Sequence, residues 1–78
     1  MPLHFLDTRD GDDFVEDEVG LELRGLEEAK VEAAKTLAEI PRDVIPGSDR
    51  RVLIVEVRED RRPVLEARLT FEALILAK

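Results

Sequence analysis

The chain has 78 residues, a formal net charge of −7 and no cysteine. This length allows one domain with a small core, spanning residues 1–78, and the lack of cysteine excludes disulfides and thiolate metal sites. Because no basic leader precedes an apolar run and no stretch approaches the ~20 apolar residues of a membrane span, we expect a cytoplasmic protein without membrane contact.

The first predicted strand covers residues 3–9 and is followed by Asp10-Gly11, a dipeptide that suits a two-residue hairpin turn. With these two residues in the turn, Asp7 lies opposite Phe14. We expect the core face of this hairpin to carry its large apolar side chains, Leu3, Phe5 and Phe14. The acidic segment 16–18 that follows is predicted to be solvated.

Apolar residues recur at helical spacing from Leu26 to Val44, which predicts one amphipathic helix. Gly25 is a permitted N-cap, and Pro41 removes a backbone hydrogen bond, so the regular helix is expected to end near Ile40. The stripe that should face the core consists of Leu26, Ala29, Ala33, Leu37, Ile40 and Val44.

Alternating apolar and polar residues predict two further strands, residues 52–57 and 65–71. The favoured register is the one that pairs opposite charges, Glu56 with Arg68 and Arg58 with Glu66. It places Arg61-Arg62-Pro63 at the hairpin tip. The sequence therefore predicts an α+β domain in β-β-α-β-β order, with one helix packed on one face of an antiparallel sheet.

Candidate catalytic and metal-binding residues are few. The acidic residues of the first hairpin lack the spacing of an EF-hand loop, so a solvated turn is favoured over a Ca²⁺ or Mg²⁺ site. His4 is the single histidine and Ser48 lies in a Gly-Ser-Asp loop, but no nucleophile motif surrounds either residue. We predict no catalytic residue, no cofactor-binding residue and no metal ligand.

Arginines make the second hairpin the one basic neighbourhood: Arg50, Arg51, Arg58, Arg61, Arg62 and Arg68. Sheets that bind single-stranded nucleic acid add exposed aromatic side chains for base stacking, and this hairpin lacks them. The acidic remainder of the chain repels phosphate. Nucleic-acid binding is therefore not expected.

Several short motifs occur together in this chain. They are Met1-Pro2 before an aromatic-containing strand, Arg9-Asp10-Gly11-Asp12, Leu26-Glu27-Glu28-Ala29 at the start of an Ala-rich helix, and a last strand reaching Leu69-Thr70-Phe71. Over nearly the whole chain this arrangement resembles a family of short bacterial proteins known only as a domain of unknown function. The resemblance concerns turn and core residues, and it implies no catalytic residues.

The apolar C-terminal segment is the remaining candidate site. Leu74, Ile75 and Leu76 follow the last strand, and a polar domain of this size has little surface of its own on which to bury them. We expect a non-enzymatic interaction module that forms a homodimer through these residues, with the tail folding back on its own domain as the alternative. The second hypothesis is an antitoxin-like regulatory protein whose acidic face covers a basic protein partner.

Overall fold

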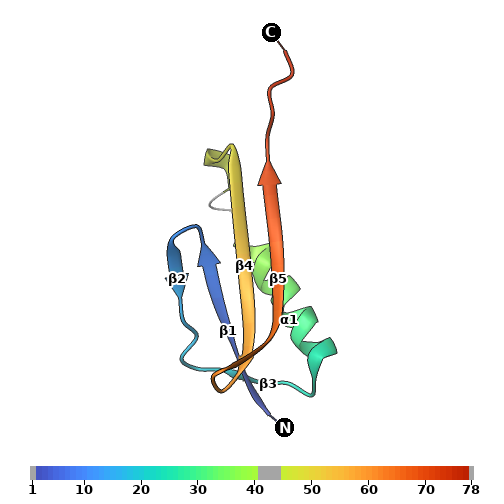
Figure 1. Cartoon of the computed structure of the whole chain (residues 1–78). Helices are drawn as coiled ribbons and strands as arrows, with labels where there is room; N and C mark the ends of the chain where they lie inside the picture. The colour runs from blue at the N-terminus through green and yellow to red at the C-terminus, as the bar shows by residue number, and fades with distance from the viewer. Residues whose placement is uncertain (1, 41–44, 78) are drawn as a thin grey trace.

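One antiparallel sheet with one helix across a face makes up the described part of the chain, residues 2–40 and 45–77, in a computed structural model (Figure 1). The elements are β1 (Leu3–Asp10), β2 (Asp13–Val15), β3 (Leu21–Glu22), α1 (Leu26–Glu39), a 3₁₀ helix η1 (Ile45–Gly47), β4 (Arg50–Glu59) and β5 (Arg62–Glu72). Among the described residues the sheet order is β2-β1-β4-β5, and the short strand β3 also pairs with β1. The predicted α+β fold is confirmed.

The core lies between α1 and the two long strands β4 and β5. Helical spacing places Ala29, Ala33 and Leu37 on the buried side of α1, as predicted. Leu26, which the predicted stripe also included, is 56% exposed at the first position of the helix, so the prediction is wrong for this residue. They meet the alternating side chains of β4, Leu53, Val55 and Val57. Gly25 is the N-cap, and the helix closes at Ile40, whose N–H donates to the Thr36 carbonyl. The predictions for residues 41–44 lie outside the described residues, and none of the described helices is long and apolar enough to cross a membrane.

The helix covers the opposite face of β1 from the one predicted. His4 and Leu6, not Leu3 and Phe5, lie on the helix side, because they pair with Glu59 and Val57 of β4. Both faces of β1 carry apolar side chains, so its own alternation does not decide which face is covered. The continuous apolar face of β4 decides it, and the predicted phenylalanine core is wrong.

The first hairpin turns one residue later than predicted. Asp10 pairs with Asp13 and Arg9 with Phe14, so Gly11 and Asp12 are the turn residues. Gly11 has a φ of 62°, the left-handed conformation that such a turn needs and that glycine adopts without strain. The shift also places the Arg9 guanidinium 4.9 Å from the centre of the Phe14 ring.

The second hairpin adopts the register that the charges were expected to oppose. Glu56 lies opposite Glu66 and Ile54 opposite Arg68, so the predicted Glu56–Arg68 and Arg58–Glu66 pairs are wrong. Two features explain this register. Asp60 takes a φ of 55° and forms the turn with Arg61, so Arg62 and Pro63 belong to β5 and the predicted tip Arg61-Arg62-Pro63 is wrong for these two residues. The ladder also shifts by one residue beside Val57 and Arg58. In this register the Arg58 side chain binds Asp7 of β1 instead of Glu66 of β5.

Candidate functional site

Arg58 and Asp7 form the most buried ion pair among the described residues. Arg58 Nε donates to Asp7 Oδ2 at 2.7 Å, and the Asp7 side chain is only 3% exposed. This hydrogen bond raises the pKa of Arg58 further above its ordinary value, and the nearby Asp7 charge adds to it against the cost of desolvation. The second Asp7 oxygen, Oδ1, accepts the Asp17 N–H at 2.9 Å. Both carboxylate oxygens of Asp7 are therefore engaged.

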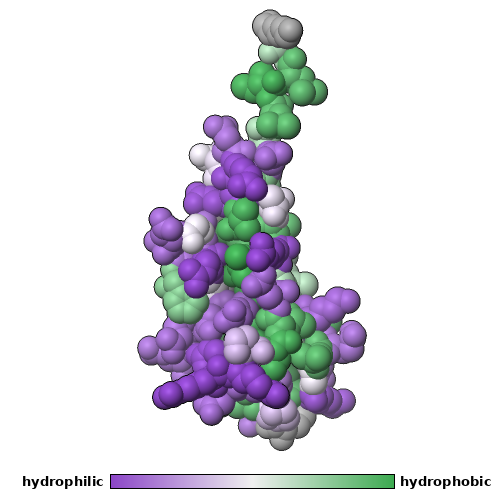
Figure 2. Space-filling model, in the orientation of Figure 1, coloured by the Kyte–Doolittle hydropathy of each residue, from purple (hydrophilic) through white to green (hydrophobic). Residues whose placement is uncertain are grey.

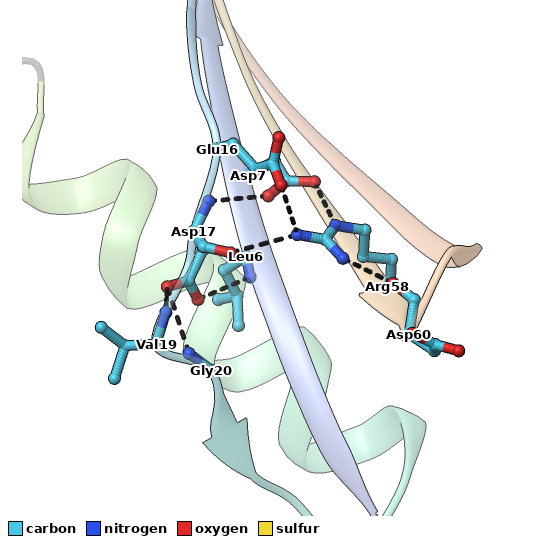
Figure 3. Close-up of polar contacts among 8 residues, drawn as sticks. All are labelled: Leu6, Asp7, Glu16, Asp17, Val19, Gly20, Arg58 and Asp60. Carbon is cyan, nitrogen blue, oxygen red and sulfur yellow. Dashed lines mark hydrogen bonds and ion pairs between the residues drawn. The ribbon is translucent and has the colours of Figure 1, made fainter.

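The remaining edges of the Arg58 guanidinium hold two other segments (Figure 3). One nitrogen donates to the Asp17 carbonyl at 3.1 Å, and another donates to the Asp60 carbonyl in the β4–β5 turn. The guanidinium carbon lies 4.5 Å from the centre of the Phe5 ring, and Nη2 of Arg58 lies 3.5 Å from Oε2 of Glu16. Arg58 thus connects β1, the β4–β5 turn and the segment between β2 and β3.

Asp17 organises that segment by accepting backbone hydrogen bonds. Its carboxylate accepts from the N–H groups of Leu6, Val19 and Gly20 at 3.1, 3.0 and 3.2 Å (Figure 3). Burial alone would raise the pKa of Asp17, but these hydrogen bonds and the charge of Arg58 outweigh it, so the pKa is lowered. The prediction that residues 16–18 are all solvated is wrong for Asp17.

His4 and Ser48 do not come together. The His4 ring is buried, with Nδ1 3.2 Å from the Pro2 carbonyl oxygen and Nε2 3.4 Å from Glu59 Oε2 at the end of β4. Ser48 precedes the other end of β4, where its hydroxyl accepts from Arg51 Nε at 3.1 Å. A nucleophilic relay between them has no geometric basis.

The acidic and basic side chains pair largely with one another. Asp10 of the first hairpin binds Arg51 at 3.0 Å, and no group of three acidic or histidine side chains within residues 2–40 and 45–77 could hold a metal ion. Three other arginines of the second hairpin contact acids as well, in the pairs Arg50–Glu72, Arg62–Glu59 and Arg68–Glu66. Five of the six arginines in the basic neighbourhood of the sequence are therefore paired with acidic side chains of the same chain.

The outer edge of β5 is the longest strand edge without a neighbouring strand among the described residues. In the part of the chain that the structure describes, β5 pairs with β4 alone. The Ala73 N–H donates to the Asp49 carbonyl at 2.8 Å, in line with the β4–β5 ladder. Because successive residues of a strand direct their backbone groups to opposite edges, this bond directs those of Leu65, Ala67 and Leu69 toward β4. The backbone groups of Glu66 and Arg68 are left to the outer edge.

The C-terminal tail continues from this edge and extends away from the domain (Figure 1). Leu74, Ile75 and Leu76 are 72%, 93% and 89% exposed, so they do not cover the sheet or the helix of their own chain. Figure 2 shows the tail as an apolar projection above a largely polar body.

A hollow of about 320 Å³ lies at the opposite end of β5, beside the β4–β5 turn and the start of α1. Its lining combines apolar and ionic side chains: His4, Gly25, Leu26, Glu59, Arg62, Pro63 and Val64.

These features define a small α+β domain in which buried charged side chains connect the segments and in which three consecutive large aliphatic side chains of the tail are exposed. The family described as "Domain of unknown function (DUF6894)" matches residues 3–70, and the chain belongs to this family. The resemblance seen in the sequence is confirmed. No curated protein and no solved structure matches the chain.

Sequence reasoning missed the Arg58 cluster, which consists of Arg58 and the side chains of Asp7, Asp17 and Phe5 around it. Its signal is Asp7, a charged residue in the middle of a strand that carries apolar residues on both faces before it. A carboxylate at such a position needs a cation, and the sequence places Arg58 on another strand. The assumed register had assigned Arg58 to Glu66 instead.

Proposed function

We propose that this protein is a non-enzymatic interaction module that self-associates through the outer edge of β5 and the tail residues Leu74, Ile75 and Leu76. The observation that carries the proposal is the exposure of these three large aliphatic side chains directly after an edge strand. The polar side chains that could serve chemistry, Asp7, Asp17 and Arg58, already bind one another and the backbone.

The energetic argument concerns a small domain with an uncovered apolar segment. Each large aliphatic side chain gains about 1.5–3 kcal/mol when it is fully buried. A two-fold contact buries the same segment twice, and it covers the strand edges that would otherwise promote uncontrolled aggregation. A homodimer therefore uses the tail and the edge at once. We place this dimer in the cytoplasm, which fractionation of the native cells would check.

Light scattering as a function of concentration tests the proposal. The full chain is expected to be a dimer, and a chain ending at Ala73 is expected to be a monomer with the same circular dichroism spectrum. Val19→Ser is the matched control, because Val19 is 85% exposed but lies in the segment between β2 and β3. A monomeric full chain at millimolar concentration, or a truncated chain that stays dimeric, would overturn the proposal.

The regulatory alternative has narrower support. Its acidic face would be the first hairpin, where Asp12, Asp13 and Glu18 remain exposed. Asp7, Asp10 and Asp17 of the same region are engaged by Arg58, Arg51 and backbone N–H groups, which weakens the field that a basic partner would meet. Isolation of a basic protein with the chain from its host, lost in an Asp12→Asn, Asp13→Asn, Glu18→Gln variant, would favour it.

A further inference from the structure

We propose that two copies pair their β5 strands in antiparallel fashion about a two-fold axis that passes between the Ala67 residues, so that the two sheets become one. This inference rests on the proposed self-association and specifies its register. It follows from three properties of β5: the order of its charges, the direction of its backbone groups and the position of the tail.

The geometry of a strand edge first limits the registers. When two identical strands pair antiparallel about a two-fold axis perpendicular to the sheet, directly opposite residues share a face. The axis must therefore pass through a residue position, so that this residue faces its own copy. The central candidates are Glu66, Ala67 and Arg68.

The charges of β5 favour Ala67. With the axis there, Glu66 lies opposite Arg68 of the partner subunit, and Leu65 lies opposite the partner's Leu69. Within one chain Arg68 Nε already contacts Glu66 Oε2 at 2.6 Å on the face away from α1. The dimer would extend this pair to four charges of alternating sign, while Leu69, which is 39% exposed, is covered by an aliphatic side chain.

The two neighbouring registers place like charges on the axis. An axis at Glu66 brings two glutamates face to face, and an axis at Arg68 brings two arginines face to face. Like charges directly opposite each other destabilise a strand pair. In the monomer Glu66 already lies opposite Glu56 of β4, so a further carboxylate beside it is particularly unfavourable.

The backbone fits the same register. The N–H and C=O groups of Glu66 and Arg68 point to the outer edge, so these two residues would exchange hydrogen bonds with Arg68 and Glu66 of the partner subunit. Ala67 then forms a non-hydrogen-bonded pair with its copy, in which the Cα atoms lie about 4.5 Å apart. The small alanine side chain suits this close approach.

The register also gives the tail a binding place. Pairing about Ala67 brings Leu74 of the partner subunit level with Asp60 in the β4–β5 turn, beside the hollow whose apolar lining is Leu26, Pro63 and Val64. Each exposed tail is thus placed beside the apolar part of this hollow on the other copy. The hydrophobic segment and the hollow lie at opposite ends of β5, as a two-fold contact requires.

Single cysteine substitutions can determine the register of the dimer, because the natural chain has no cysteine that would form other disulfides. Three variants, Glu66→Cys, Ala67→Cys and Arg68→Cys, are oxidised at a concentration at which the natural chain is a dimer in light scattering, and are then separated on non-reducing gels. Ala67→Cys is expected to form the disulfide dimer. In each of the other two variants, the cysteine and its copy on the partner subunit are offset by two residues along the strand, about 6.6 Å, and are separated by ~4.8 Å between strands. The resulting distance between their Cα atoms exceeds the ~7 Å limit of a disulfide.

Charge reversal provides a second test that leaves the core untouched. Glu66→Lys makes the pair positive and Arg68→Glu makes it negative, so each variant is expected to dimerise at least tenfold more weakly than the natural chain. An equimolar mixture of the two is expected to regain a dimer of natural strength. Both variants stay folded, because both side chains are exposed.

The outcomes separate this inference from the proposed function. A natural chain that dimerises while Glu66→Cys or Arg68→Cys cross-links faster than Ala67→Cys, or while the charge variants dimerise normally, overturns the register and leaves self-association standing. A natural chain that is monomeric at all concentrations overturns both.

Discussion

The Arg58 cluster and the outer side of β5 are two polar regions of one sheet that differ in where their polar groups point. Those around Arg58 bind one another, and those along β5 face away from the sheet. Around Arg58, the carboxylates of Asp7 and Asp17 accept hydrogen bonds from the guanidinium and the backbone, and they hold three segments together (Figure 3). Along β5, the backbone groups of Glu66 and Arg68 face outward, and three exposed aliphatic residues follow. Charged residues in a small acidic domain therefore do not by themselves mark a site: the first region completes the fold and the second is available for a partner.

The comparison divides the residues into two classes with different expected phenotypes. Changes near Arg58 should reduce the free energy of unfolding of each subunit and should affect association only through folding. Changes at the β5 edge or the tail should weaken association and leave the isolated subunit folded.

The largest expected effect is that of Leu37→Ala, which sets the scale for both regions. Leu37 is buried in the last turn of α1 against the core that includes β4, so its truncation should cost about 2–5 kcal/mol. Urea denaturation monitored by circular dichroism measures this loss. Glu39→Ala, on the exposed side of the same helix, should be nearly neutral. A loss below about 1 kcal/mol for Leu37→Ala would mean that the packing of α1 is wrong.

Asp7→Ala should be the most damaging polar change. It removes the acceptor of the Asp17 N–H, and an unsatisfied buried donor costs about 1–3 kcal/mol, to which the stranded guanidinium adds. The thermal midpoint should fall, and the loss should be similar in dilute and concentrated protein. Asp13→Ala is the matched control at an exposed position. Equal midpoints for the two variants would contradict the role assigned to the cluster.

Asp17 should make the domain sensitive to acid. Its pKa is lower in the folded state, so its charge stabilises the fold above the unfolded pKa near 3.8, and this contribution is lost as the pH falls through the folded value. Asp17→Asn should therefore destabilise the domain at pH 6 and have a smaller effect below pH 3. Thermal denaturation across this range would show it. A penalty for Asp17→Asn that does not change with pH would count against an ionised cap.

The smallest effect on subunit stability is expected in the tail. Leu74→Ser with Ile75→Ser should change the free energy of unfolding of the dilute monomer by less than about 0.5 kcal/mol, because both side chains are exposed. The same change should abolish the dimer in light scattering. If the double variant unfolded as a less stable monomer, the tail would belong to the subunit's own core.

The sequence predicts correctly the elements whose apolar residues lie on one face only. Helical spacing in α1 and alternation in β4 each indicate a single apolar face, and both faces were located correctly except for Leu26, which is exposed at the start of α1. β1 has apolar residues on both faces, so the covered face depends on the strand beside it. The register of β5 depends on a turn at Asp60 and on Arg58 of β4, which binds Asp7 of the neighbouring strand β1, a residue far away in the chain. Such long-range pairings leave no local pattern.

Amide hydrogen exchange in β5, followed by NMR at two protein concentrations, tests most directly whether the outer edge of β5 pairs with a second copy. At millimolar concentration the N–H groups of Glu66, Ala67 and Arg68 should all exchange slowly. After dilution to low micromolar, the outward N–H groups of Glu66 and Arg68 should exchange much faster, while that of Ala67, directed at β4, stays protected. Rapid exchange of Glu66 and Arg68 at both concentrations, with Ala67 protected, would contradict a paired β5 edge.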